Sequence, residues 1–222
     1  MITRGDAYGG WTMCTPLHSL SDQLVYTIGV GRNIKWDEAI MKEFHTIHHG
    51  WDPTPTAQDF FSKRSIPSQF YFHNVGLAAH DGSINLKLPE GNADSYTVMH
   101  QKGEAQEGTE GVYPVLTLQS MMRHNHHDHL AILKIDVEGA EFDVVKAWHE
   151  KRANVAADQV LIEFHGRYFD SGSNMVRQAV KQMDELGFML VHRTKLEYTF
   201  AKKKLIRMFR RSNKGTNVGA SI

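Results

Sequence analysis

The 222-residue chain is predicted to be an α/β protein with a Rossmann-like, doubly wound and mostly parallel sheet. Short apolar runs alternate with segments of helical periodicity, which is typical of strands and helices in such a sheet. Hydrophobic residues make up 41% of the chain, enough for one domain with a sizeable core. The last two apolar runs are joined too closely for a helical crossover, so a terminal antiparallel strand is expected.

In the first half, the segment 1–23 is rich in Gly, Ser, Thr and Pro and is expected to be irregular. The run LVYTIGVG then predicts a strand that ends in a tight glycine turn, and WDEAIMKEF has the apolar spacing of a helix. The expected strands of this half are 24–31, 45–52 and 68–78, and the expected helices are 36–44 and 53–64.

In the second half, the polar, glycine-rich segment 89–111 is expected to be a long loop that closes over a substrate. Gly187 is placed to stop an amphipathic helix. A short extension or hairpin is expected at 83–88. The expected strands are 130–136, 158–166, 188–194 and 196–203, and the expected helices are 117–125, the segment after 136, and 174–187. This divides the chain into an irregular segment 1–23, a domain 24–202 and a basic tail 203–222.

Composition limits the possible partners. Lys and Arg together number 25, as do Asp and Glu, so zero net charge gives no support for a nucleic-acid partner. The single cysteine, Cys14, excludes an internal disulfide and a cysteine-based zinc site. With no apolar run of membrane length and no signal-peptide core, the chain is expected to be soluble and cytoplasmic, unless an anchor was cut from a longer protein.

Ligands of doubly wound sheets bind beyond the carboxyl ends of the strands. Gly29 and Gly31 follow the first strand, and Asp52 ends the second, at about the spacing where an acid binds ribose hydroxyls. The alternative for Asp52 is a helix N-cap. Ile34 stands where a dinucleotide fingerprint has its third glycine, which disfavours NAD and leaves a nucleoside without phosphates.

The stretch LAILKIDVEGAEFDVV drives an apolar strand into a group of acids. Asp136 ends that strand, and Glu138 and Glu141 are expected in the first turn of the next helix, where the dipole favours acids. Glu163 and His165 stand at the end of the following strand. Strand ends of one sheet converge, so Asp136, Glu163 and His165 are expected to form a site, whereas a structural role is sufficient for Glu141.

Several blocks together resemble the FkbM-type methyltransferases, a branch of the class I enzymes that use S-adenosylmethionine. The resemblance covers roughly 24–202 and is carried by VYTIGVGRNIKWDEAI, WDPTP, FHNVGLAAHDGS, ILKIDVEGAEFDVV and LIEFHGR. It implies the class I methyltransferase fold and O-methylation of a hydroxyl on a sugar or natural product. One departure is Lys35-Trp36-Asp37, where relatives often carry a Ser before an aromatic residue and an acid.

The resemblance also implies roles for the cofactor residues. Gly29 and Gly31 would pass under the amino-acid part of S-adenosylmethionine, and Asp52 would accept hydrogen bonds from its ribose. Leu77 and Ala78 would flank the adenine.

Asp136 would lie near the sulfonium, whose charge offsets the carboxylate. In one chemistry His165 is the general base and Asp136 and Glu163 orient it, without a metal. In the other the three bind Mg²⁺ or Mn²⁺. The metal-free version is expected, because the resemblance brings no metal with it.

The acceptor is expected to be a small molecule or glycan. Two other functions stay open at this point: a silent nucleoside-binding module of the same fold, and an NAD(P)-dependent reductase.

Overall fold

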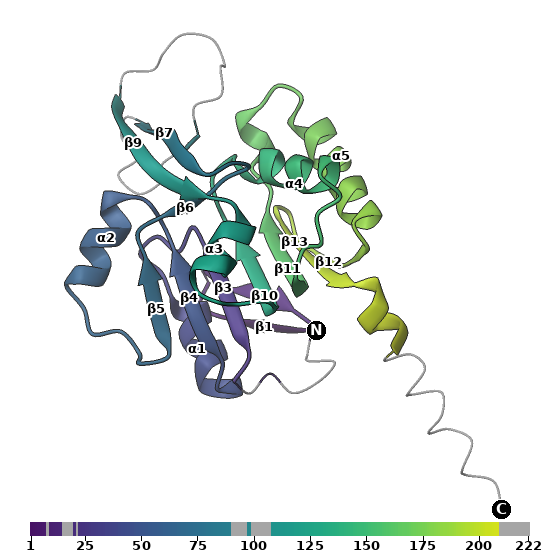
Figure 1. Cartoon of the computed structure of the whole chain (residues 1–222), viewed down its shortest axis with the longest axis horizontal. Helices are drawn as coiled ribbons and strands as arrows, with labels where there is room; N and C mark the ends of the chain where they lie inside the picture. The colour runs from purple at the N-terminus through teal and green to yellow at the C-terminus, as the bar shows by residue number, and fades with distance from the viewer. Residues whose placement is uncertain (8, 15–19, 21, 90–96, 99–107, 209–222) are drawn as a thin grey trace, which may run out of the picture.

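The computed structural model describes the chain except for residues 8, 15–19, 21, 90–96, 99–107 and 209–222. Its centre is a seven-stranded sheet in the order β12-β13-β11-β10-β3-β4-β5 (Figure 1). The strands are, in that order, Phe188–Arg193, Glu197–Lys202, Ala157–Glu163, Leu130–Ile135, Leu24–Ile28, Ile47–Trp51 and Phe70–His73. Strand β13 pairs antiparallel with both β12 and β11, and the other neighbouring strands of this sheet pair in parallel. This confirms the predicted fold class and its terminal antiparallel strand.

Helices cover both faces of the sheet. Trp36 and Ile40 of α1 pack with Val25 and Ile132 on one face, beside α2. The helices α3, α4 and α5 bury their apolar sides against the other face. The bounds are α1 Lys35–Phe44, α2 Pro55–Ser62, α3 Leu118–His124, α4 Glu141–Glu150 and α5 Gly172–Glu185, with a 3-10 turn η1 at Gly166–Tyr168.

Local sequence sets the ends of several helices. Thr54 and Thr117 cap α2 and α3 by accepting hydrogen bonds from backbone N–H groups in the first turn. Pro55 at the first position of α2 lacks only an N–H that would have no partner there. Gly187 follows α5 with a φ of +89°, as expected for a helix stop.

The predicted strand 68–78 is wrong as a single element. It divides into β5 of the main sheet and β6, Gly76–Leu77, of a second sheet with the order β6-β9-β7-β8. The chain turns at Asn74, whose Nδ2 donates a 2.9 Å hydrogen bond to the carbonyl oxygen of Asp52. Gly76 then passes so near Pro53 that a Cβ would lie 2.9 Å from the proline ring.

The second sheet also contains β7 Gly82–Pro89, β8 Thr97–Val98 and β9 Gly108–Leu116. The segment 83–88, expected to be a short extension or hairpin, is part of β7, but the end of the segment expected to be a loop belongs to β9. Most of the proposed substrate-covering loop lies outside the described residues.

The N-terminal segment 1–23 was predicted to be irregular, but part of it forms regular structure. Strands β1 Ile2–Arg4 and β2 Trp11–Met13 pair as an antiparallel hairpin. Trp11 and Met13 are buried with the α1 side of the core, and Thr199 Oγ1 donates a 2.6 Å hydrogen bond to the Thr12 carbonyl. Strands of three residues are too short to show periodicity, so this covering element could not be recognised.

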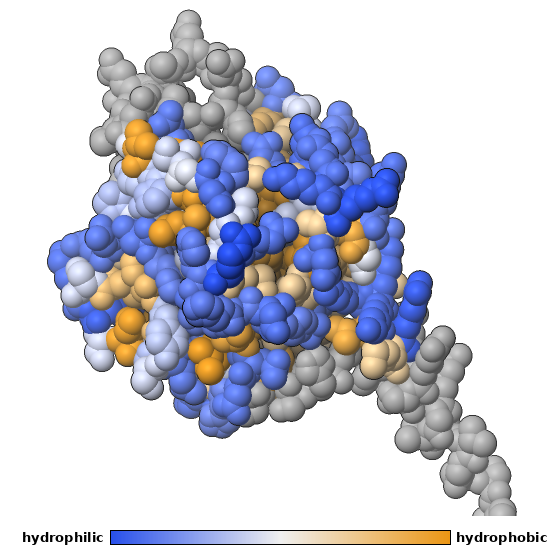
Figure 2. All heavy atoms as spheres, in the orientation of Figure 1, coloured by the Kyte–Doolittle hydropathy of each residue, from blue (hydrophilic) through white to orange (hydrophobic). Residues whose placement is uncertain are grey.

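On the face shown in Figure 2, hydrophilic side chains separate the hydrophobic ones. None of the helices in the described residues has both the length and the hydrophobicity that a membrane span requires. Residues 203–208 continue from β13 as a helical segment, and the rest of the predicted basic tail lies outside the described residues.

Candidate active site

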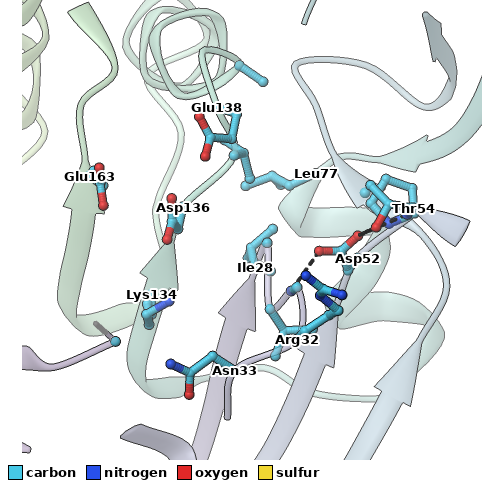
Figure 3. Close-up of a pocket in the computed structure, with 18 of the residues that line it drawn as sticks. Ile28, Arg32, Asn33, Asp52, Thr54, Leu77, Lys134, Asp136, Glu138 and Glu163 are labelled. Carbon is cyan, nitrogen blue, oxygen red and sulfur yellow. Dashed lines mark hydrogen bonds between the residues drawn. The ribbon is translucent and has the colours of Figure 1, made fainter. Parts of the chain in front are cut away.

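A cavity of about 270 Å³ opens at the carboxyl ends of β3, β4, β10 and β11. Its walls include Gly29, Asp52, Asp136 and Glu163, each at or just after the end of one of these strands. Figure 3 shows Asp52 on one side of the cavity and the acids Asp136 and Glu163 on the other. The structure thus brings together most of the residues that the sequence placed at strand ends.

The turn after β3 requires glycine. Gly29 has a φ of +74°, and a Cβ there would lie 1.6 Å from the carbonyl oxygen of Asp136. Gly31, with a φ of +53°, donates its N–H to Asp52 Oδ2 at 2.8 Å. The two glycines therefore bring the backbone against β10 and connect the turn to the acid that follows β4.

Asp52 is a buried acid in this wall, only 5% exposed. Its Oδ1 accepts hydrogen bonds from the backbone N–H and the hydroxyl of Thr54, at 2.9 and 2.6 Å. Burial raises the pKa of Asp52, although these hydrogen bonds act in the opposite direction. The N-cap of α2 is Thr54, so the alternative interpretation of Asp52 as the cap is wrong.

The two residues expected to flank the adenine are placed differently. Leu77 lines the cavity and is labelled beside Ile28 and Asp52 in Figure 3. Ala78 is buried and does not line it; its N–H donates to the carbonyl of Leu116 at 3.0 Å. Of these two residues, Leu77 is therefore the one that offers an apolar side chain to a ligand.

On the opposite side, Asp136, Glu138 and Glu163 form an acid cluster (Figure 3). Their side chains are 28%, 23% and 20% exposed. Glu138 was expected in the first turn of α4, but it precedes the helix. Its φ is +50°, and its side chain lines the cavity. Burial, and the negative charges of neighbouring carboxylates, raise the pKa of Asp136 and of Glu163.

Glu141 has a structural role at the first position of α4. Its fully buried carboxylate accepts hydrogen bonds from the N–H groups of Gly139 and His165, at 2.9 and 2.7 Å. It therefore ties the loop after β10 to the end of β11, which agrees with the structural role favoured from sequence.

His165 lies behind the acid cluster and is fully buried. Its Nε2 lies 3.3 Å from Glu138 Oε2, 3.4 Å from Glu163 Oε1 and 3.6 Å from Asp136 Oδ1. Burial alone would lower the pKa of His165, but Glu141 and the neighbouring acids raise it to about 9. The ring does not line the cavity, whereas Asp136, Glu138 and Glu163 do.

Several cavity residues were not predicted from the sequence. Lys134, on β10, places its Nζ 4.4 Å from the ring centroid of Trp11, and both line the cavity. A lysine inside an apolar strand, two positions before Asp136, was the available signal. Trp11 gave none, because its hairpin was not recognised. Further lining residues include Arg32, Asn33, Trp36, Thr54 and Glu197.

Solved structures of methyltransferases and related proteins are similar to the chain, at low identity. A Methanococcus jannaschii fibrillarin pre-rRNA processing protein is 7% identical, with a TM-score of 0.47 over 85% of this chain and 69% of the other. An Aeropyrum pernix fibrillarin, solved with natively bound S-adenosyl-L-methionine, is 10% identical, with a TM-score of 0.45 over 84% and 67%. A Pyrococcus furiosus methyltransferase is 9% identical, with a TM-score of 0.37 over 82% and 75%. No curated protein matches the chain.

The family comparison is decisive, because it covers most of the chain. The model of the methyltransferase FkbM domain matches residues 19–190, which include the glycine turn, Asp52, Asp136, and the end of β11. The chain therefore belongs to the FkbM methyltransferase family, as its motifs predicted, and S-adenosylmethionine is its cofactor.

Proposed function

We propose that this protein transfers a methyl group from S-adenosylmethionine to a hydroxyl oxygen of a small-molecule or glycan acceptor. One observation supports this most: a single cavity has a glycine turn and a buried acid at one side and three carboxylates at the other. The first side suits a nucleoside with an amino-acid chain. The second suits an acceptor that must lose a proton as it reacts.

The residues present fit the cofactor. Gly29 lines the cavity and carries no side chain, so its backbone can face the amino-acid part of the ligand. Asp52 has acceptor capacity beyond its bonds to Gly31 and Thr54, which suits ribose hydroxyls. Leu77 would contact the adenine, with Ala78 behind it as part of the supporting strand end.

When bound, the cofactor would supply a methyl group on a positively charged sulfur, which would keep the electrons of the carbon–sulfur bond as the acceptor oxygen takes the methyl. Asp136, at the end of β10, would face that positive charge. Holding the acceptor in line at near-contact distance would supply much of the rate.

Glu163 is assigned as the group that receives the acceptor proton. It lines the cavity, whereas His165 is buried behind it, with Nε2 3.4 Å from Glu163 Oε1. A carboxylate with a raised pKa is a better base than an ordinary one. His165 then acts as a positioning residue that holds the acids, rather than as the base expected from sequence.

Two measurements test the proposal. Calorimetry with S-adenosylhomocysteine and NADH, run side by side, is expected to show binding of the first alone. Methyl transfer from labelled S-adenosylmethionine is then measured with hydroxyl acceptors and with the matching amines. Transfer to amines alone would contradict O-methylation, and binding without transfer to any acceptor would favour a silent nucleoside-binding module.

A further inference from the structure

The acid cluster lies against the imidazole of His165, whose ring nitrogens make no hydrogen bond to the described residues. The side chain of His165 is 1% exposed, and neither Nδ1 nor Nε2 has a hydrogen-bond partner among the described residues. Buried polar atoms of native proteins are nearly always paired. Nε2 nevertheless faces the oxygens of Asp136 and Glu138 at 3.6 and 3.3 Å, longer than a good hydrogen bond.

We propose that Asp136, Glu138 and His165 bind a divalent metal cation. One ligand atom from each lies within 4.8 Å of the others. Around a cation with ligands at about 2.0–2.6 Å, neighbouring octahedral ligands are about 2.8–3.7 Å apart. The distances of 3.3 and 3.6 Å from Nε2 to the two carboxylates lie in this range.

The charges of the region are consistent with a cation. Lys134 and Arg167 supply two positive charges nearby, and Arg167 lies 3.6 Å from both Glu138 and Glu163. The carboxylates around the His165 ring outnumber them: Asp136, Glu138, Glu141 and Glu163. A proton on the ring or a bound cation can supply the balance, and the two compete for Nε2.

Two carboxylates and one imidazole suit Mn²⁺, and Mg²⁺ less well because it prefers oxygen ligands. Asp136 and Glu138 line the cavity, so free coordination positions would face the acceptor. A hydroxyl on such a cation loses its proton more easily. That catalytic role rests on the proposed function, but metal binding does not. This set of ligands differs from the metal site considered from the sequence, which had Glu163 in place of Glu138.

The test is Mn²⁺ binding to the full chain after EDTA treatment, without cofactor. Calorimetry is expected to show one site, and pulsed electron paramagnetic resonance is expected to show nitrogen coupling from a directly bound imidazole. Glu138→Gln, a conservative change in a loop, is expected to weaken Mn²⁺ binding at least tenfold. Glu150→Gln, at a side chain 63% exposed on α4, is the matched control and is expected to stay within twofold of the wild type.

Three results would overturn the site: no stoichiometric Mn²⁺, Mn²⁺ without nitrogen coupling, or equal affinity in the two variants. Circular dichroism of Glu138→Gln is the check that a loss of binding does not come from a loss of folding. Methyl transfer in EDTA with no Mn²⁺ binding removes the site and leaves the proposed function. Stoichiometric Mn²⁺ binding without methyl transfer does the reverse.

Discussion

Two buried histidines, His165 and His49, have pKa values shifted in opposite directions. His165 ends β11 among carboxylates, which raise its pKa to about 9. His49, on β4, lies among other imidazoles and aromatic rings, and its pKa is lowered to about 3. Burial lowers the pKa of both, so the difference comes from their neighbours.

The surroundings of His49 explain the lowered value. Its Nδ1 is 2.8 Å from His73 Nε2, and these two rings stack at 5.1 Å. The ring of His127 meets it edge-on at 4.8 Å, and Tyr71 stacks at 5.0 Å. After burial, the charges that other histidines would carry are the next causes of the low pKa.

The two regions therefore serve different purposes. The imidazoles of the His49 region pack as polar aromatic rings over β4 and β5. The His165 region places several carboxylates at the cavity. Bringing these like charges together costs free energy of folding, but it provides groups that can take part in catalysis. Substitutions should accordingly affect catalysis in one region and acid stability in the other.

The largest expected effect is on catalysis. Glu163→Gln keeps the shape of the side chain but cannot accept a proton, so kcat is expected to fall by roughly 10²–10⁴. Binding of S-adenosylhomocysteine should change little, because Asp52 and the glycine turn are intact. Steady-state kinetics and calorimetry check the two halves.

His165→Ala is the companion variant, since it leaves Glu163 in place. A lower kcat in a folded His165→Ala supports its positioning role. Full activity would remove the histidine from the mechanism, and full activity in Glu163→Gln would remove the proposed base.

The next largest effect is expected at Asp52, the buried acid on the opposite side of the cavity from His165. Asp52→Ala is expected to weaken S-adenosylhomocysteine binding by roughly 1.5–3 kcal/mol, the range for hydrogen bonds to a charged group. Calorimetry measures this, with Asp59→Ala on the exposed side of α2 as the control. Equal affinities in the two folded variants would reject the ribose assignment.

The His49 region is expected to weaken the fold in acid. The folded pKa of His49, about 3, lies below an unfolded value near 6.5, so the unfolded chain binds more protons between these values. Its contribution to stability is therefore lost as pH falls from 6.5 towards 3, by about 2 kcal/mol at pH 5. Urea unfolding at pH 7 and pH 5 should show a smaller loss in His49→Gln than in the wild type.

The control for that experiment is His45→Asn, at the exposed C-cap of α1. It removes a histidine that solvent reaches in the folded state. If His45→Asn reduced the acid loss as much as His49→Gln does, burial would not be the cause.

The smallest effect is expected at a third histidine, paired with an acid but at the surface. His149 Nε2 lies 2.6 Å from Glu185 Oε2, between α4 and α5, with side chains 35% and 45% exposed. Solvent screens such a pair, so His149→Ala should change the free energy of unfolding by less than about 1 kcal/mol. Urea unfolding should show even less difference in 1 M salt, and a larger, salt-independent loss would indicate a packing role.

Much of the fold could be predicted because its signals are local. The apolar runs of β3, β10 and β11, and the caps of α2 and α5, are visible in short stretches of sequence. The same is true of Gly29, Gly31, Asp52, Asp136 and Glu163, since residues after parallel strands must meet at one edge.

Only the tertiary structure decided the rest. Glu138 enters the cavity because its backbone is left-handed, and Trp11 enters it because a hairpin of three-residue strands folds over the sheet. His165 shares β11's end with Glu163, yet packing places one behind the cavity and the other in its wall. The sequence determines which groups come to the sheet edge, but burial and neighbours, set by contacts between distant segments, determine which of them carry charge and which can reach a ligand.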